Sequence, residues 1–420
     1  MSTSRFPLKI SSNKRYLIDQ SDRPFLIQGD AAWSLIARVT REEAKQYLDN
    51  RSRKAFNTIL VNLIEHWFSE DPPKNVYDEE PFETPNDFSS PNRKYFDHVD
   101  WVVTKAQEKD VQLLLAPMYL GYPGTNEGWF EEILAAPLSQ CLEYGRYLGM
   151  RYSKFDNILW SIGADRNSTY PGLLERMNMI ALGIKEYDSR HLMTAQCEPE
   201  SSSVDQFSAG GWMDFNAVYS YEIVHRKLLS EYNRKPIMPV FLIESSYEGE
   251  HNSSQVQIRR QAYWSVLCGG FGHVFGNFPV DVSSPGWQFA MDSPGAYSMA
   301  NWGRLFKSRP WHKLVPDQKH TLVTDGLGEF RGLDYLAAGS TNDGGTIIAY
   351  MPSARTIRID IRKMSGTKVN AWWFDPASGR TTSEGEFSAK GFADLSPPKE
   401  GDWVLVLDDA SKKLPPPGAA

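Results

Sequence analysis

Acidic side chains follow several of the apolar runs in the first three quarters of the chain, and two of these acids form the best pair. Asp165 comes shortly after the run at residues 157–162, and Glu244 directly follows the run at 240–243. Hydrolysis of a glycosidic bond requires two facing carboxyl groups, one protonated to donate to the leaving oxygen and one ionised to attack the anomeric carbon. These residues therefore favour a glycosidase with Asp165 and Glu244 as the catalytic pair.

Eight short apolar runs would have to position these acids, and they alternate with longer segments of helical spacing. The runs cover residues 25–29, 58–63, 111–117, 157–162, 191–195, 215–220, 240–243 and 272–275. One intervening segment begins with Thr40 and Glu43, which have the spacing of a capping box at a helix start. Eight strands with intervening helices predict an α/β fold, a (β/α)8 TIM barrel over residues 1–315. The rival is a doubly wound open sheet, but the glycine-rich phosphate loops GxGxxG and GxxxxGK do not occur in the sequence.

In a barrel the carboxyl ends of the strands meet at one rim, and the ends of the fourth and seventh strands lie opposite each other. Asp165 and Glu244 occupy these two positions, so the fold would place them on either side of one glycosidic bond. A second interpretation stays open, in which either acid is a rim carboxylate neutralised by an arginine such as Arg166 or Arg259.

Other side chains at the strand ends are candidates for contacts with a sugar. Asp30 follows the first run and is predicted to lie at the floor of the site, where it would take two hydroxyls. Aromatic faces pack on the C–H faces of sugar rings, and the candidates are Trp33, Tyr119, Tyr221, Tyr247 and Trp287. The candidates for hydroxyl contacts are Asn62, Glu65, His66, Arg166, Gln196 and Glu222. Each of them has an alternative role in packing the fold.

The segment at residues 65–92 is rich in proline and acidic residues and follows the second predicted strand. This position predicts a long active-site loop. The alternative is a solvated insertion that makes no contact with substrate.

The pattern changes to strands only after Trp311. Strand-like runs at 335–338, 346–350, 356–361, 369–374 and 403–407 are separated by turns, which predicts a small all-β sandwich domain over residues 316–410. Such a domain either binds polysaccharide or caps the barrel, and the structural role is favoured. The proline-rich tail at 411–420 is predicted to be disordered.

The composition excludes several classes of protein. The chain of 420 residues has 45 Lys and Arg against 52 Asp and Glu, a net charge of −7 without a basic block, so nucleic acid is not an expected partner. No apolar run is long enough to span a membrane. The three cysteines form no CxxC pair, HExxH and GxSxG are absent, and we expect neither a metal nor a cofactor. The N-terminus has no secretory apolar segment, which predicts a cytoplasmic protein unless an exported form has been trimmed.

Several longer runs resemble the apiosidase-like family of glycoside hydrolases. They lie at residues 29–33 (GDAAW), 40–44 (TREEA), 95–100 (YFDHVD), 157–167 (NILWSIGADRN), 260–265 (RQAYWS) and 308–311 (SRPW). Residues 371–376 (AWWFDP) and 402–408 (DWVLVLD) resemble the β-sandwich that accompanies this family and is often labelled a collagen-binding domain. The resemblance covers nearly the whole chain, although nothing in these residues points to collagen.

The resemblance implies a retaining mechanism on a TIM barrel, with Asp165 as acid/base and Glu244 as nucleophile. It also implies exo-action on a terminal furanose, apiose first, in a plant-type glycan or glycoside. The chain departs from the family at Ala164, where a second glycine is usual, and at Ile243 and Ser245, where Gly-Glu-Pro is frequent around the nucleophile. The alternatives are a glycosidase for arabinofuranosides, galactofuranosides or pyranosides, and a carbohydrate-binding barrel without turnover.

Overall fold

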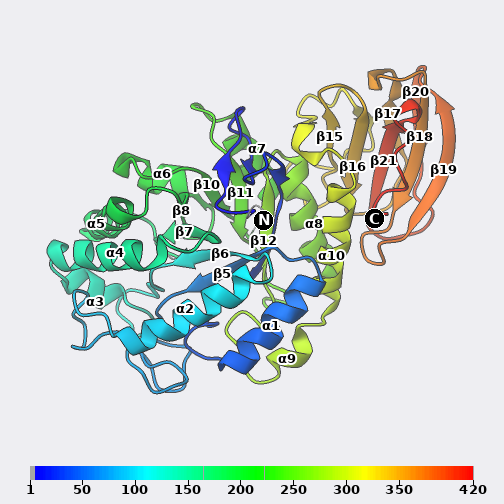
Figure 1. Ribbon diagram of the computed structural model, residues 1–420. Helices are drawn as coiled ribbons and strands as arrows, with labels where there is room; N and C mark the ends of the chain where they lie inside the picture. Colours follow the sequence, from blue (N-terminus) through cyan, green and yellow to red (C-terminus); the bar gives the residue numbers. More distant parts are fainter. Residues whose placement is uncertain (1–4, 164, 222, 420) are drawn as a thin grey trace.

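The computed structural model describes residues 5–163, 165–221 and 223–419. Within these residues the largest sheet has nine strands, in the order β8-β7-β6-β5-β4-β12-β11-β10-β9. Because β12 pairs in parallel with β4, the last long strand returns to the first and the sheet is curled (Figure 1). The strands are β4 (Ile27–Ala31), β5 (Thr58–Asn62), β6 (Gln112–Ala116), β7 (Ile158–Ile162), β8 (Met193–Ala195), β9 (Ser201–Ser202), β10 (Asn216–Tyr219), β11 (Val240–Glu244) and β12 (Gly272–Phe275).

The eight predicted runs each overlap one of the strands that pair in parallel, and the ninth strand, β9, is antiparallel to β10. The first strand begins at Ile27, two residues later than predicted. Phe25 belongs instead to β3 (Pro24–Phe25), which forms a small antiparallel sheet with β1 (Lys9–Ile10) and β2 (Leu17–Ile18). This N-terminal sheet is tied to the rest of the fold by Arg15, whose Nη1 donates to the backbone oxygen of Tyr232 at 2.5 Å.

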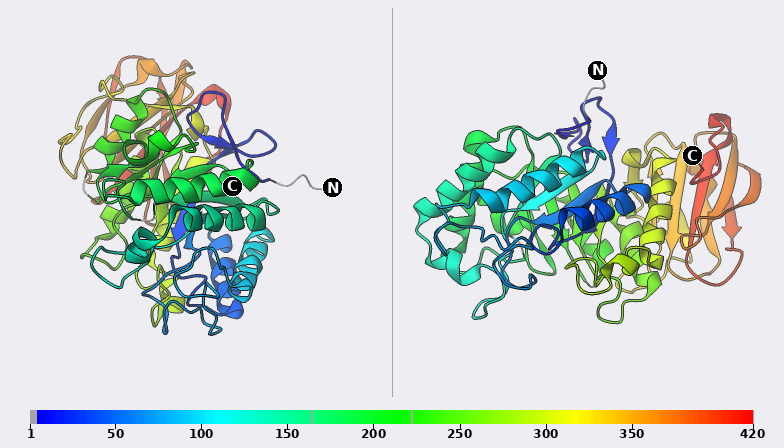
Figure 2. Two further views of the ribbon diagram at one scale, coloured as in Figure 1. Left: turned by 90° about the vertical axis from the view of Figure 1, so that its left-hand side faces the viewer. Right: turned by 60° about the horizontal axis from the view of Figure 1, so that its bottom comes forward.

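Helices cover the outer face of the curled sheet, as the views in Figures 1 and 2 show. The predicted capping box is present, because the Thr40 side chain accepts from the backbone N–H of Glu43 and the Glu43 carboxylate accepts from that of Thr40. Between β8 and β10 the helices are short, as the tight spacing of the sequence requires. The helices are α1 (Arg41–Arg53), α2 (Arg93–Gln107), α3 (Phe130–Ala135), α4 (Leu138–Tyr152), α5 (Leu173–Tyr187), α6 (Ser203–Phe207), α7 (Val224–Asn233), α8 (Gln255–Leu267), α9 (Trp287–Ala290) and α10 (Pro294–Lys307), with a 3-10 turn η1 (Ser208–Gly210). None of the described helices is long and apolar enough to cross a membrane.

The remainder of the described chain forms an all-β region. One sheet has the order β13-β15-β16-β21-β18-β19 and the other the order β14-β17-β20, and a separate apolar cluster is built from both. The strands are β13 (Leu314–Pro316), β14 (Val323–Asp325), β15 (Ala337–Thr341), β16 (Thr346–Met351), β17 (Ile357–Asp360), β18 (Lys368–Phe374), β19 (Thr381–Ser388), β20 (Phe392–Leu395) and β21 (Trp403–Asp409). Short 3-10 turns are η2 (Trp311–Lys313), η3 (Ile361–Lys363) and η4 (Ala410–Lys412). Since β13 already pairs with β15, this region begins two residues before the predicted boundary.

The all-β region packs against α8 and lies beside α8 and α10 in Figure 1. Asn301 of α10 donates to the backbone oxygens of Pro376 and Ala377. Arg259 of α8 forms two hydrogen bonds to Asp402, at 2.7 and 2.8 Å, and both side chains are buried. The rings of Tyr263 and Tyr350 are stacked at 4.6 Å. Arg259 is therefore engaged at this interface, and the interpretation that it neutralises one of the two candidate acids is wrong.

The predicted disordered tail is ordered as far as Ala419 and packs against both regions. Arg309 donates to the backbone oxygen of Pro415 at 2.8 Å, and Thr381 donates to that of Pro417 at the same distance. The backbone N–H of Gly418 donates to the Ser308 hydroxyl at 3.0 Å. Polar side chains of the folded regions thus form hydrogen bonds with the backbone of the tail and hold it in place. The proline-rich composition of the tail gives no sign of these contacts.

Candidate active site

Asp165 lies in a sharp turn after β7. Gly163 has φ +91° and Asp165 has φ +75°, and a Cβ on Gly163 would lie only 2.7 Å from the backbone oxygen of Gln196. Positive φ is strained for a residue other than glycine and is maintained only where the surroundings enforce it. Burial raises the pKa of Asp165 to about 6; Arg166 opposes the rise, and the Glu198 and Glu127 carboxylates add to it.

Glu244 is the last residue of β11 and is buried. Gln196, which follows β8, donates from its Nε2 to Oε2 of Glu244, and the hydroxyl of Tyr247 also bonds to this carboxylate. Burial raises the pKa of Glu244 well above its usual range, and the Asp165 carboxylate raises it further. The two acids that the sequence singled out therefore interact electrostatically in the fold.

The position of Tyr247 depends on two neighbours. The indole Nε1 of Trp33 donates to the Tyr247 hydroxyl oxygen at 3.0 Å, which leaves the hydroxyl proton for Glu244. A Cβ on Gly276 would lie 2.1 Å from the Tyr247 ring, so only glycine leaves room for the ring there. Trp33 and Tyr247, both predicted to pack against sugar, thus form a chain of hydrogen bonds that ends on Glu244.

Two tyrosines at the end of β10 face the same acids. Tyr219 is the last residue of the strand, and Tyr221 lies two residues beyond it. Tyr219 donates from its hydroxyl to that of Tyr221 at 2.6 Å. Burial raises the pKa of both hydroxyls, and the charges of Glu244 and Asp165 add to the rise. Tyr221 was predicted to be a site residue, whereas Tyr219 was not, although its position within a predicted strand near the rim was a usable signal.

Two further acids at the strand ends have strongly raised pKa values. Burial raises the pKa of Glu65 to about 7, although the Ser34 hydroxyl donates to this carboxylate at 2.6 Å and thereby lowers the pKa. Burial also raises the pKa of Asp281 to about 8, with help from the Glu250 carboxylate. Asp281 acts in turn on the pKa of Glu244, which places it at this site. Asp281 lies in the loop after the eighth predicted strand and was not among the predicted site residues.

Several buried polar atoms around these acids have no hydrogen-bond partner among the described residues. They are both amide atoms of Asn62, Oε1 of Glu65, Oδ1 of Asp165, Nε and Nη2 of Arg166, Oε1 of Gln196 and Oδ1 of Asp281. More than nine-tenths of buried polar groups in proteins have a partner, so a concentration of free ones marks a place where a ligand rich in hydroxyls would fit. In the described part of the chain, no group of three or more His, Cys, Asp or Glu side chains is arranged to hold a metal ion.

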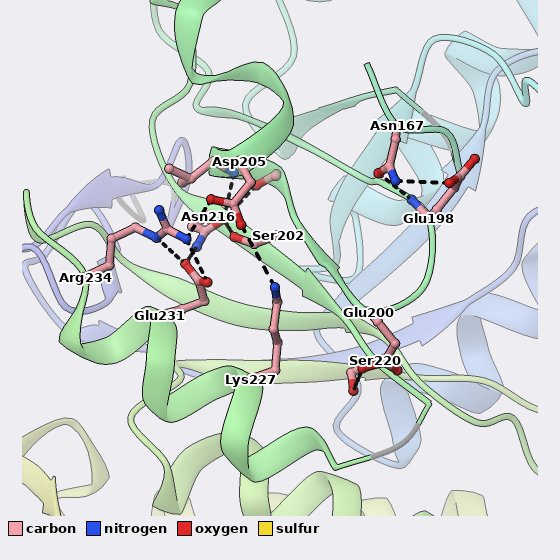
Figure 3. A network of polar contacts seen from close by, with 12 residues as sticks. Asn167, Glu198, Glu200, Ser202, Asp205, Asn216, Ser220, Lys227, Glu231 and Arg234 are labelled. Atoms are coloured by element: carbon pink, nitrogen blue, oxygen red, sulfur yellow. Dashed lines mark hydrogen bonds and ion pairs between the residues drawn. The ribbon is translucent and has the colours of Figure 1, made fainter. Parts of the chain in front are cut away.

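The rim beside these residues is braced by polar contacts (Figure 3). In the loop after β8, Glu198 accepts from the side-chain amide of Asn167 at 3.0 Å, and Glu200 accepts from the Ser220 hydroxyl at 2.9 Å. Farther along, Asn216 of β10 accepts from Ser202 and donates to Glu231 of α7, each at 3.0 Å. Glu198 thus ties the loop after β8 to the loop after β7, and Glu200 ties it to the end of β10. Gln196 lies at the start of this braced loop.

Two predicted sugar contacts, His66 and Trp287, do not join this cluster. Asp30 is fully buried, and Arg51 donates to its Oδ2 at 2.5 Å while Tyr47 bonds to the same oxygen. Its Oδ1 has no partner among the described residues, and burial and the Asp30 charge both raise the pKa of Asp281, so the contact of Asp30 with sugar hydroxyls stays a prediction. The Nε2 atom of His66 lies 3.6 Å from Oε1 of Glu132 on α3, and its ring packs on Trp129. Trp287 is buried on α9 against Tyr47. Glu222 lies outside the described residues.

The predicted active-site loop at 65–92 is anchored over most of its length by aromatic packing. Phe82 and Phe88 contact each other at 5.0 Å, and both contact Trp129 and Tyr144. The beginning of the loop approaches Asp165 through Phe68, whose ring contacts that of Tyr119 at 5.6 Å, and burial and the Asp165 charge both raise the pKa of Tyr119. Contact of this loop with substrate stays a prediction.

Comparisons with known proteins bear on the family and the fold. The family model of the apiosidase-like catalytic domain matches residues 11–313, and a model described as a "collagen-binding domain of a collagenase" matches residues 315–408. A solved glycoside hydrolase is similar with a TM-score of 0.86 and 26% identity, covering 97% of this chain and 98% of that one. A glycoside hydrolase family 5 protein from Bacteroides vulgatus has the same TM-score at 25% identity, with 97% and 94% covered. A β-mannanase from the blue mussel Mytilus edulis shares the fold alone, with a TM-score of 0.51, 12% identity and coverage of 73% and 98%. No curated protein sequence matches the chain.

Proposed function

The chain belongs to the apiosidase-like family of glycoside hydrolases, and we propose that it is a retaining glycosidase with Asp165 as the acid/base and Glu244 as the nucleophile. The observation that carries the proposal is the electrostatic coupling of these two carboxyl groups, which come from strands on different sides of the curled sheet. A retaining glycosidase needs its two carboxyl groups about 5 Å apart, so that the nucleophile reaches the anomeric carbon directly.

The surroundings favour placing the proton on Asp165. Gln196 and Tyr247 both donate to Glu244, and such bonds stabilise its charged form. Burial favours the neutral form of both carboxyl groups and raises the pKa of Glu244 further than that of Asp165. The hydrogen bonds distinguish the two acids, because the buried Oδ1 of Asp165 has no such donor among the described residues to stabilise a charge there. In the first step Glu244 forms a bond to the anomeric carbon while Asp165 gives its proton to the departing oxygen. In the second, Asp165 takes a proton from water, which displaces Glu244 and releases the sugar.

We propose further that the curled sheet is a closed (β/α)8 barrel. The backbone N–H of Asp214 donates to the backbone oxygen of Met193, and the N–H of Met193 donates to Oδ2 of Asp214, both at 2.8 Å. These two bonds link β8 to the segment that leads into β10, the two strands that would have to meet for closure. The all-β region then acts as a β-sandwich that covers the barrel surface through contacts such as Arg259 with Asp402.

The proposed substrate is a terminal furanose, apiose first, at the non-reducing end of a plant-type glycan. The family supports this choice, and the cluster of buried acids and amides supports a compact, hydroxyl-rich sugar. A glycosidase for arabinofuranosides, galactofuranosides or pyranosides is the alternative. Screening aryl furanosides and pyranosides, followed by NMR of the first-formed product anomer, tests both sugar and mechanism. Activity confined to pyranosides contradicts the furanose, and a product of inverted configuration contradicts the retaining mechanism.

A further inference from the structure

Two side chains of opposite charge meet beside Asp165. Arg166 lies in the loop after β7 and Glu198 in the loop after β8, and Nη1 of Arg166 is 3.9 Å from Oε1 of Glu198. The Arg166 side chain is 3% exposed and that of Glu198 is 28% exposed. Because solvent screens buried charges far less than exposed ones, the charge of Arg166 acts strongly on its neighbours.

Arg166 is held next to Asp165 by three contacts. Its Nη1 donates to the backbone oxygen of Asp165, and its backbone N–H donates to that of Gly163 at 3.2 Å. Its guanidinium carbon lies 4.0 Å from the centre of the Tyr122 ring. In the described part of the chain, Glu198 is the one carboxylate that forms an ion pair with this guanidinium. The position of Arg166 is therefore fixed, and Glu198 supplies its counter-charge.

Glu198 is held in place by two residues of the loop after β7. The side-chain amide of Asn167 donates to Oε2 of Glu198 at 3.0 Å, and the backbone N–H of Glu198 donates to Oδ1 of Asn167 at 3.3 Å (Figure 3). The Tyr170 hydroxyl donates to Oε1 of Glu198 at 3.1 Å. Both carboxylate oxygens thus accept a hydrogen bond, which stabilises the charged form of Glu198 and fixes where its charge lies.

The other titratable groups that interact with Asp165 do not neutralise Arg166. Burial raises the pKa of each tyrosine and of the cysteine among them, so these groups are uncharged in the neutral range. Glu127 accepts a hydrogen bond from the Tyr119 hydroxyl at 2.7 Å, and Gln196 and Tyr247 bond to Glu244. The set consists of Glu127 and Tyr119 after β6, Cys197 after β8, Tyr219 and Tyr221 at the end of β10, and Glu244.

This pairing matters because an acid/base residue needs both of its forms. It must be protonated when the leaving oxygen departs and ionised when water attacks. Burial raises the pKa of Asp165 to about 6, Arg166 opposes the rise, and Glu198 adds to it. A cation without a counter-charge would favour the ionised form of Asp165 and weaken the first step, whereas a paired cation still supports the ionised form in the second.

We propose that Glu198 is a positioning residue that neutralises Arg166 and thereby keeps the proton on Asp165 until the leaving oxygen takes it. The inference rests on the proposed function, in which Asp165 is the acid/base. Glu198 acts through Arg166 and not through the substrate, so its charge is what the reaction requires. Its hydrogen bonds to Asn167 and Tyr170 serve to hold that charge at the guanidinium.

The kinetic test begins with Glu198→Gln, which removes the charge and keeps the length of the side chain and one acceptor oxygen. The basic limb of kcat/KM for a substrate with a poor leaving group should move to lower pH. At pH 7 the loss should be roughly 3- to 10-fold, since above its pKa the protonated fraction of an acid falls tenfold per pH unit. Aryl glycosides whose leaving group needs no proton should be hydrolysed as before. An unchanged basic limb overturns the inference.

Two further variants separate the charge of Glu198 from its bracing of the loops. Glu198→Asp keeps the charge but shortens the reach to Asn167 and Tyr170, and its basic limb should stay close to that of the wild type. A merely bracing role predicts the reverse, with a larger loss for Glu198→Asp than for Glu198→Gln at every pH, and this result overturns the inference. The control is Glu175→Gln, which removes an exposed acid in the first turn of α5 and should change neither limb.

Carboxyl NMR separates this inference from the proposed function. The full chain is labelled with carbon-13 at the aspartate side-chain carboxyl, and the Asp165 signal is assigned by its absence in Asp165→Asn. The measured pKa of Asp165 should be lower in Glu198→Gln than in the wild type and in Glu175→Gln. That result supports the inference even if the wild-type protein hydrolyses none of the tested glycosides, which would contradict the proposed function alone. An unchanged pKa, with normal turnover by the wild type, contradicts the inference alone.

Discussion

The indole nitrogen of Trp33 donates a hydrogen bond to the hydroxyl of Tyr247 at 3.0 Å, and Tyr247 bonds in turn to the Glu244 carboxylate. Trp33 follows β4 and Tyr247 follows β11, so the contact joins two loops that are more than 200 residues apart in sequence. Its consequence is that the proposed nucleophile is oriented by a chain of hydrogen bonds that begins at Trp33 on a different loop.

Tyr247→Phe removes the donor at the end of this chain. A hydrogen bond to a charged group contributes about 1.5–3 kcal/mol, so we expect kcat to fall roughly 10- to 100-fold. In the wild type the hydrogen bond from Tyr247 lowers the pKa of Glu244, so the pKa of Glu244 should rise in the variant. Because Glu244 must be ionised to attack, the acidic limb of the pH–rate profile should move to higher pH. A loss of kcat without this movement would mean that Tyr247 acts on another step.

Glu244→Ala should abolish hydrolysis of an activated aryl glycoside without unfolding the protein. Azide should then restore turnover and give a glycosyl azide of inverted configuration, detected by NMR. The matched control is Glu248→Ala, because Glu248 accepts bonds from Asn277 and from the backbone N–H of Gly295, both at 2.9 Å. This variant should unfold at a lower temperature, because each buried donor that loses its acceptor lowers the free energy of unfolding by about 1–3 kcal/mol. If Glu248→Ala stays stable and is the inactive variant, Glu244 is not the nucleophile.

Asp165→Ala should slow substrates with poor leaving groups roughly 10²- to 10⁴-fold and spare aryl substrates whose leaving group needs no proton. In the wild type, only the protonated form of Asp165 can donate, and its pKa is raised to about 6. We therefore expect kcat/KM for poor leaving groups to fall as the pH rises above about 6, and this basic limb should disappear in the variant. Equal losses on both kinds of substrate would argue against the acid/base role.

Deleting everything after Pro316 should leave an aggregating or unfolded first region. Arg309 and Asp408 form a buried ion pair at 2.7 Å, and Arg259 pairs with Asp402 in the same interface. Removing one partner of a buried pair costs about 3–5 kcal/mol, and the truncation removes two carboxylates at once. Circular dichroism and size-exclusion chromatography measure the outcome. A folded, fully active fragment would show that the all-β region is an independent module.

Local patterns were sufficient for most of the secondary structure of the first region, and they led to the proposal of Asp165 and Glu244 as the catalytic pair. The capping box at Thr40 and the apolar runs depend on residues within one turn or one strand, so the sequence alone determines them. Several predicted strands are followed by acids, and Asp165 and Glu244 were chosen among them because the order of the strands predicts that these two face each other.

Tertiary structure decided which side chains of a strand or loop face the site. Asp30 of β4 meets Arg51 and Tyr47 of α1 through Oδ2 alone, an arrangement that depends on how the helix packs on the sheet. Asp281 and Tyr219 join the acids because loops and strands distant in sequence meet at one rim. Contacts of this kind have no local signature, and the tail held by Arg309 and Ser308 shows the same limit, since its order comes from partners about 100 residues away.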